Sequence, residues 1–134
     1  MNSASAGSPY RAGPVQVLPF GAPGAEALVR LAGSLGLAVA RIDLGGCRDK
    51  DELLGRIAVG LALPEWFGRN WDALYDCLAD LDPGGGAGYL LVLEHAGELR
   101  REAPEDFDTA VGILSDVSAE WSRRGLPFRA FVDA

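Results

Sequence analysis

The chain has 134 residues, of which 49% are hydrophobic, so it is long enough to form one compact domain with its own core. It carries 19 acidic and 12 basic residues, a net charge of −7, which argues against the basic surface that nucleic-acid-binding proteins use. We therefore expect no direct contact with nucleic acid, and a surface that attracts a basic partner.

The first third of the chain is predicted to contain a disordered leader and one βα unit. Residues 1–14 are rich in Ser, Ala, Gly and Pro and show no apolar periodicity, which is typical of a disordered leader. Residues 15–20 predict a short strand, and residues 23–35 predict a helix that Gly33 weakens. The apolar positions of this helix are Ala27, Leu28, Leu31 and Leu35. We expect residues 15–36 to form an N-terminal extension that could add one βα unit at a sheet edge.

A strand and a capped helix follow. Residues 37–44 are predicted to form a strand that ends in a Gly45-Gly46 turn. Asp49 is a suitable N-cap for the next helix, because its side chain can accept a hydrogen bond from a free backbone N–H. The apolar residues of this helix recur at helical spacing, and Pro64 ends it. They are Leu53, Leu54, Ile57, Ala58 and Leu61.

The next predicted helix, over residues 70–81, is the most informative segment of the chain. With Asn70 as the N-cap and about 100° per residue, one side of the helix is apolar and the other carries carboxylates. Cys77 lies on the apolar side, so we interpret it as a small buried core residue. The apolar side consists of Trp71, Leu74, Cys77, Leu78 and Leu81. The opposite side consists of Asp72, Tyr75, Asp76, Ala79 and Asp80.

Two carboxylates on this helix are neighbours, which lowers the stability of the helix. Asp72 and Asp76 are four residues apart, and like charges at this spacing cost roughly 0.2–0.5 kcal/mol. A solvated acidic face is the ordinary interpretation of such a pair. Here Trp66 and Phe67 precede the helix and Tyr75 lies between the aspartates, and aromatic side chains beside charge are typical of binding hot spots. The segment therefore favours a binding surface.

A buried strand, a long helix and a closing strand complete the predicted fold. Residues 89–93 form a continuous apolar run, as expected of a strand buried on both faces of a parallel sheet. Residues 106–124 predict a helix that ends at Gly125, and residues 128–132 predict a last strand. The inward residues of the helix are Phe107, Ala110, Val111, Leu114, Val117 and Trp121. Strands that alternate with helices predict an α/β fold with a small, mostly parallel sheet.

The protein is expected to be soluble and cytoplasmic. The N-terminus shows neither a basic segment nor an apolar run of signal-peptide length, and no segment approaches the roughly eighteen apolar residues of a membrane span. Cys47 and Cys77 are compatible with free thiols in a reducing compartment. We expect no contact with a membrane.

Few residues are available for catalysis, and we expect no enzyme and no cofactor. His95 is the single histidine, which does not favour a hydrolase triad or a zinc site with several His or Cys ligands. The glycines between positions 84 and 88 lack the lysine and hydroxyl of a phosphate loop. The alternative is a magnesium site formed by Asp72, Asp76 and Asp80, which could assist phosphoryl transfer.

The segment around the acidic helix resembles the signature of the barstar family, the intracellular protein inhibitors of small secreted microbial ribonucleases. The resemblance extends over residues 37–134, so we expect a barstar-like domain there, with a small, mostly parallel three-stranded sheet and helices on it. The matching residues are Pro64-Glu65, two aromatics, Gly68, Asn70, Asp72-Ala73-Leu74, an aromatic at position 75 and Asp76-Cys77-Leu78.

The resemblance implies binding without chemistry. In that family the motif helix and the loop before it block the active site of the ribonuclease, with carboxylates in the places of RNA phosphates. Asp76 would be the main inserted charge and Asp72 a second, while Trp66 would cover the catalytic histidine of the enzyme. The implied partner-binding residues are Trp66, Gly68, Asn70, Trp71, Asp72, Tyr75, Asp76 and Glu120.

The implied partner is a basic secreted ribonuclease or a ribonuclease-type toxin, as in a toxin and immunity-protein pair, bound by a monomer of this chain. Glu120 points away from Trp121 on the helical wheel, so we expect its side chain to be free to reach that partner. The sequence departs from the barstar pattern at Asp80, where barstar has a glycine, and at Arg124, which replaces an acidic residue. The alternative is a barstar-related protein that binds another basic toxin or protein.

Overall fold

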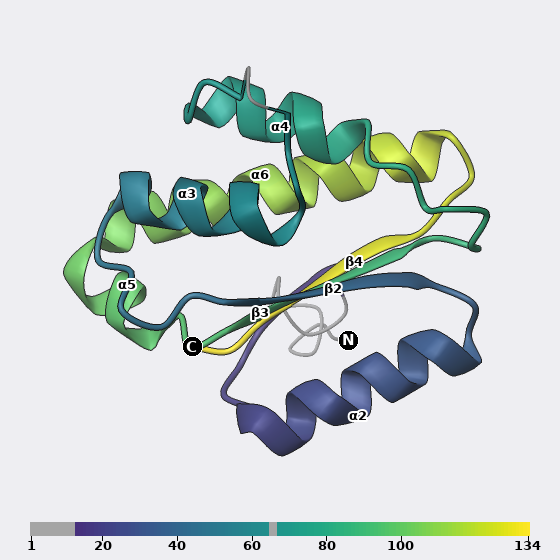
Figure 1. Cartoon of the computed structure of the whole chain (residues 1–134), viewed down its shortest axis with the longest axis horizontal. Coiled ribbons are helices and arrows are strands. Elements are labelled where there is room, and N and C mark those ends of the chain that lie inside the picture. Colours follow the sequence, from purple (N-terminus) through teal and green to yellow (C-terminus); the bar gives the residue numbers. More distant parts are fainter. Residues whose placement is uncertain (1–12, 65–66) are drawn as a thin grey trace, which may run out of the picture.

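The computed structural model describes residues 13–64 and 67–134, which form alternating strands and helices (Figure 1). In this part of the chain, no helix is both long and apolar enough to cross a membrane. The strands are β1 (Val15–Val17), β2 (Ala38–Asp43), β3 (Tyr89–Glu94) and β4 (Phe128–Val132). The helices are α2 (Gly21–Ser34), α3 (Lys50–Gly60), α4 (Trp71–Ala79), α5 (Gly97–Glu102) and α6 (Pro104–Arg123).

The described strands form one parallel sheet in the order β1-β4-β3-β2. Each neighbouring pair is parallel, from Val15 opposite Ala130 at one edge to Asp43 opposite Glu94 at the other. The predicted α/β fold with a parallel sheet and helices packed on it is confirmed. The sheet has four strands, because β1 adds to the edge of β4 as the extra N-terminal βα unit.

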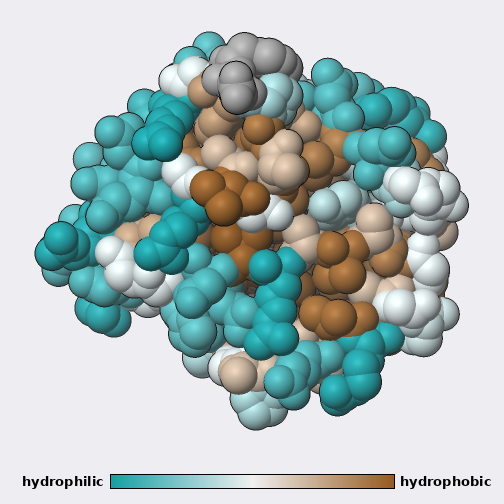
Figure 2. Space-filling model, viewed as in Figure 1, coloured by the Kyte–Doolittle hydropathy of each residue, from teal (hydrophilic) through white to brown (hydrophobic). Residues whose placement is uncertain are grey.

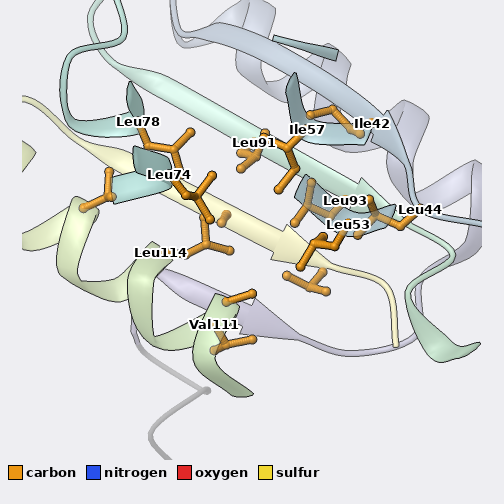
Figure 3. Packing of buried hydrophobic residues seen from close by; sticks show 14 of the residues in the cluster. Ile42, Leu44, Leu53, Ile57, Leu74, Leu78, Leu91, Leu93, Val111 and Leu114 are labelled. Carbon is orange, nitrogen blue, oxygen red and sulfur yellow. The ribbon is translucent and has the colours of Figure 1, made fainter. Parts of the chain in front are cut away.

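The sheet separates two layers of helices (Figure 1). Alternate residues of β3 point to opposite faces of the sheet. Leu91 and Leu93 belong to the main core, whereas Leu90 and Val92 pack in a smaller cluster with α2. Figure 3 shows leucines of α3, α4 and α6 meeting the sheet residues in the main core. All six residues of β3 are buried, so the prediction of a strand covered on both faces is confirmed.

The helix α2 forms where it was predicted, but its inward face is different. Ala25 and Ala32 are fully buried, whereas Leu31 and Leu35 are 51% and 57% exposed. The predicted apolar face was therefore wrong at Ala27, Leu31 and Leu35, which are all exposed, whereas Leu28 is half-buried and packs against the smaller cluster. Small alanines let α2 approach Leu90 and Val92 closely, and the longer leucines then lie at the sides. In the view of Figure 2, apolar side chains reach solvent in the middle of the face shown, with hydrophilic side chains around them.

Predicted and observed boundaries agree closely along most of the remaining chain. The Asp49 side chain accepts a hydrogen bond from the backbone N–H of Glu52, 2.9 Å away, so the predicted N-cap of α3 is confirmed. The short helix α5 was not predicted, since Leu99 is its single buried residue and six residues show no periodicity. The helix α6 begins at Pro104 rather than at position 106, as suits a proline in the first helical turn.

The predicted leader lies almost wholly outside the described residues, which begin at Gly13. Pro14 is described, and its carbonyl oxygen accepts a hydrogen bond from the backbone N–H of Ala130 at 2.9 Å. The division of the chain into residues 15–36 and 37–134 stays a prediction.

A histidine and an aspartate at the carboxyl end of the sheet predict a weak dependence of stability on pH. His95 Nδ1 lies 2.8 Å from Asp43 Oδ1, and the two side chains are 54% and 65% exposed. This contact raises the pKa of His95, and the hydrogen bonds from His95 and from the backbone N–H of Gly45 lower the pKa of Asp43. The pair therefore stabilises the fold fully between the ordinary pKa values of 3.8 and 6.5.

We expect His95→Gln to lower the free energy of unfolding by about 0.2–1 kcal/mol at pH 5, because exposed ion pairs are weak. The difference should vanish as pH rises through the raised pKa of His95 or falls through the lowered pKa of Asp43. Urea unfolding of both proteins at pH 5 and at pH 9 measures this. A difference of the same size at the two pH values would contradict the assignment.

Candidate functional site

The loop before α4 is anchored in the core by Phe67, and it ends at Asn70, the N-cap of the helix. Phe67 is buried in the main core, and its backbone N–H donates to the carbonyl oxygen of Pro64 at 2.9 Å. Asn70 Oδ1 accepts a hydrogen bond from the backbone N–H of Ala73 at 2.7 Å, so the predicted N-cap is confirmed. A Cβ at position 68 would lie 3.0 Å from Asn70 Nδ2, which explains why glycine suits Gly68.

We expect Asn70→Ala to lower the free energy of unfolding by about 0.5–2 kcal/mol, because the N–H of Ala73 would lose its acceptor. Urea denaturation measures the change. Asn70→Asp is the matched control, since a carboxylate can cap the same N–H and suits the positive end of the helix dipole. Equal stabilities of the alanine and aspartate variants would contradict the capping role.

The residues of α4 that were predicted to face inward do so in the structure. Leu74, Cys77 and Leu78 are buried, while Trp71 and Leu81 are half-buried against the same core. Burial raises the pKa of the Cys77 thiol, and the nearby carboxylates act in the same direction. The interpretation of Cys77 as a core residue is confirmed, since a buried thiol with a raised pKa is a poor nucleophile.

The C-terminal end of α4 is held by a side chain of α6 and by that of the residue that follows α6. The indole Nε1 of Trp121 donates to the carbonyl oxygen of Leu78 at 3.1 Å, and Arg124 donates to that of Ala79 at 2.5 Å. Carbonyl groups in the last turn of a helix lack partners inside the helix, so these contacts satisfy them. Ala79 is buried under this contact, and its expected place on the open face was therefore wrong.

Between α4 and the C-terminal end of α6 lies a shallow hollow of about 290 Å³. It brings together three predicted site residues, two from α4 and one from α6. Asp76 is exposed, and Tyr75 and Glu120 are half-buried. The residues that line the hollow are Tyr75, Asp76, Ala79, Asp80, Glu120 and Arg124.

Glu120 is not free, contrary to its predicted exposure on the helical wheel. The Arg123 guanidinium donates two hydrogen bonds to Glu120 Oε1, at 2.6 and 3.1 Å, and Arg124 Nε lies 3.7 Å from Glu120 Oε2. The hydrogen bond from Arg123 is the main reason that the pKa of Glu120 is lowered. Residues three and four positions apart on a helix are neighbours, so Arg123 and Arg124 can reach Glu120. The prediction from the helical wheel considered only the direction of Glu120 and not these neighbours.

The carboxylates of α4 have a different environment. Asp72, Asp76 and Asp80 are exposed, and none of them takes part in the ion pairs of residues 13–64 and 67–134. The Lys50 ammonium lies 5.3 Å from the centre of the Trp71 ring, where it makes a cation–π contact. The face of α4 therefore presents carboxylates that form no ion pair within the described residues.

The remaining predicted site residues are spread along the loop and the first turn of α4. Gly68 and Asn70 shape the start of the helix, and Asp72 lies one turn before Asp76 on the same face. Trp66 lies outside the described residues. Asp80 and Arg124 also line the hollow, but they were absent from the predicted partner-binding residues. Their spacing could have indicated them, because each lies four residues after a predicted residue, Asp76 and Glu120 respectively.

The carboxylates do not form a compact cluster. Within the described residues, no three His, Cys, Asp or Glu side chains are grouped so that they could hold a metal ion. A larger hollow of about 680 Å³ lies beside α6 and β4, but Arg129 is the single charged residue of its lining. The hollow beside α4 is therefore the better candidate for recognition based on charge.

Comparison with known proteins identifies one family. A family model described as Barstar (barnase inhibitor) matches residues 37–133. The match includes α4, the C-terminal half of α6 and every predicted site residue, and it leaves β1 and α2 outside. No curated protein matches the chain.

Proposed function

The chain belongs to the barstar family of barnase inhibitors, and on that premise we propose that it inhibits a barnase-type ribonuclease. The acidic face of α4 and the loop before it would enter the active site of the enzyme, with carboxylates in the positions of RNA phosphates. The observation that supports this proposal most is the hollow in which Tyr75, Asp76 and Glu120 come together. We propose no catalytic role and no cofactor for the chain.

Asp76 is the central charge in this proposal. Its carboxylate is exposed, and the described residues supply no ion-pair partner for it, so a cation of the ribonuclease could take that position. Asp72 would be a second contact one turn away. The half-buried rings of Trp71 and Tyr75 would cover the edge of the interface, because aromatic side chains add contact area at a small entropic cost.

Contacts at both ends hold α4 in place in the free protein, which favours tight association with the ribonuclease. Trp121 and Arg124 fix the C-terminal end of α4 on α6, and Asn70 caps its N-terminal end. A binding element that is already ordered loses little conformational entropy when the complex forms. We therefore infer that α4 binds as a rigid unit.

Charge would also set the rate of association. The ribonuclease cleft must attract RNA and is therefore basic, while this chain has a net charge of −7. Opposite charges steer the two proteins together, and salt screens the attraction beyond about 8 Å at physiological ionic strength. We propose that the protein is a cytoplasmic monomer that meets a secreted-type ribonuclease or ribonuclease toxin inside the cell.

The direct test is titration of barnase with the purified full chain, with hydrolysis of RNA as the readout. We expect activity to fall to zero at one inhibitor per enzyme, and the association rate to fall at least about tenfold between low and high salt. An unrelated acidic protein of similar size and charge is the control for nonspecific effects. Full activity at a large excess of the chain would exclude inhibition of barnase.

The second candidate is a binding protein for another basic toxin or protein. The presence of Arg124 inside the hollow favours it, because a cation there does not suit a partner that is basic throughout. The magnesium alternative is tested separately by calorimetry with millimolar Mg²⁺. Heat of binding that disappears in Asp76→Ala would favour the metal site.

A further inference from the structure

The hollow contains one cation among its lining residues, and that cation is fixed in place. Arg124 follows the last residue of α6, and its guanidinium lies 5.7 Å from the ring centre of Trp121. The same group donates to the carbonyl oxygen of Ala79 at 2.5 Å. The side chain is still 44% exposed, so a bound partner can contact it.

The two walls of the hollow consequently differ in charge. The α4 wall carries Asp76 and Asp80, which have no ion-pair partner among the described residues. The α6 wall carries Glu120 together with Arg124, and Arg123 adds a second positive charge beside Glu120. The α4 wall therefore has a net negative charge, whereas on the α6 wall arginines offset the single carboxylate.

A partner must complement both walls at once. A ribonuclease cleft supplies the basic groups that suit Asp76. A Lys or Arg that faced Arg124 would instead be a like-charge contact, which costs binding free energy and slows association. A carboxylate or a carbonyl oxygen is the chemical group that suits Arg124, since a guanidinium only donates hydrogen bonds.

We propose that Arg124 is a specificity-determining residue of the inhibitory site. It disfavours ribonucleases whose cleft is bordered by Lys or Arg opposite α6, and it favours one that places a carboxylate there beside the basic pocket for Asp76. This inference rests on the proposed function and adds the kind of ribonuclease that the site selects. The residue acts through repulsion of wrong partners as well as attraction to the right one.

The experiment compares inhibition of barnase by the full chain and by Arg124→Glu, Arg124→Gln and Arg30→Glu. We expect Arg124→Glu to tighten inhibition at least about tenfold at low salt, and Arg124→Gln to lie between it and the unchanged chain. The gain should shrink at high salt. Arg124→Gln keeps an amide donor for Ala79, so it separates the effect of charge from loss of the helix contact.

Arg30→Glu is the matched control, because it changes the net charge equally on α2, the helix on the opposite face of the sheet (Figure 1). Its inhibition should stay within about threefold of the unchanged chain. An equal gain from Arg30→Glu would overturn the inference, since the effect would then come from net charge. Inhibition by Arg124→Glu that is equal to or weaker than that of the unchanged chain, with its fold intact by circular dichroism, would overturn it as well.

A second experiment changes the enzyme instead of the inhibitor. It uses barnase variants in which single Lys or Arg residues around the cleft are replaced by Glu. The unchanged chain should inhibit at least one of them about tenfold better than Arg124→Glu does. If no variant of the chain inhibits any of these enzymes, the proposed function fails and this inference fails with it. If the chain inhibits barnase but the residue at position 124 never changes the ranking, the inference alone fails.

Discussion

Replacement of Asp76 by alanine is expected to weaken inhibition of a barnase-type ribonuclease at least about 30-fold. Removal of one partner from a desolvated charge pair costs about 2 kcal/mol or more in binding free energy, because the other charge stays buried and unpaired. Asp76 is exposed and lines the hollow with Tyr75 and Glu120, so it is available to such a pair. The inhibition constant for RNA hydrolysis measures the change, which should appear mainly as faster dissociation.

The free protein should respond to the same change in the opposite direction. Asp76→Ala removes a like charge four residues from Asp72 and places a better helix former in α4, so stability should rise by about 0.5 kcal/mol. A weaker inhibitor that is at least as stable cannot be explained by unfolding. Urea denaturation of the two proteins provides this comparison.

Two variants complete the design for Asp76. Asp76→Asn keeps the shape of the side chain and removes the charge, so it should weaken inhibition nearly as much as alanine. Asp108→Ala removes the same charge from an exposed position near the start of α6, far along the helix from Glu120, and should change inhibition less than about threefold. Equal potency of Asp76→Ala and the unchanged chain would sink the proposed mechanism.

Replacement of Arg41 by methionine is expected to lower the free energy of unfolding, because the buried Glu94 carboxylate would lose the cation that it is paired with. Glu94 is 6% exposed at the end of β3, and Arg41 on the neighbouring β2 donates to both of its carboxylate oxygens. The methionine variant would leave a buried carboxylate without its cation. A buried carboxylate that has lost its hydrogen-bond donors destabilises the fold.

The double variant Arg41→Met, Glu94→Leu separates the buried charge from the lost packing. Replacement of both partners by apolar side chains of similar size is often nearly neutral, so the double variant should recover most of the stability that Arg41→Met loses. Thermal and urea unfolding at pH 7 measure all three proteins. A double variant less stable than Arg41→Met would show that the ion pair is not the cause.

Several features of the fold could be predicted because they depend on local patterns. The continuous apolar run of β3, the Asp49 cap of α3 and the Asn70 cap of α4 each follow from a few neighbouring residues, and the structure has all three. The short α5 escaped prediction, since one buried leucine in six residues produces no period. The inward face of α2 escaped it because this helix lies close to the sheet, where the small side chains of Ala25 and Ala32 fit.

The sequence by itself determined the acidic face of α4, the Asn70 cap at its start and the family to which the chain belongs, because these depend on residue types at short, fixed spacing. Only the tertiary structure decided how charge is arranged at the site. The approach of α6 to α4 places Glu120 and Arg124 beside Asp76, forty-four or more positions away. Contacts between distant segments arise from packing of the core, and a helical wheel contains no information about them.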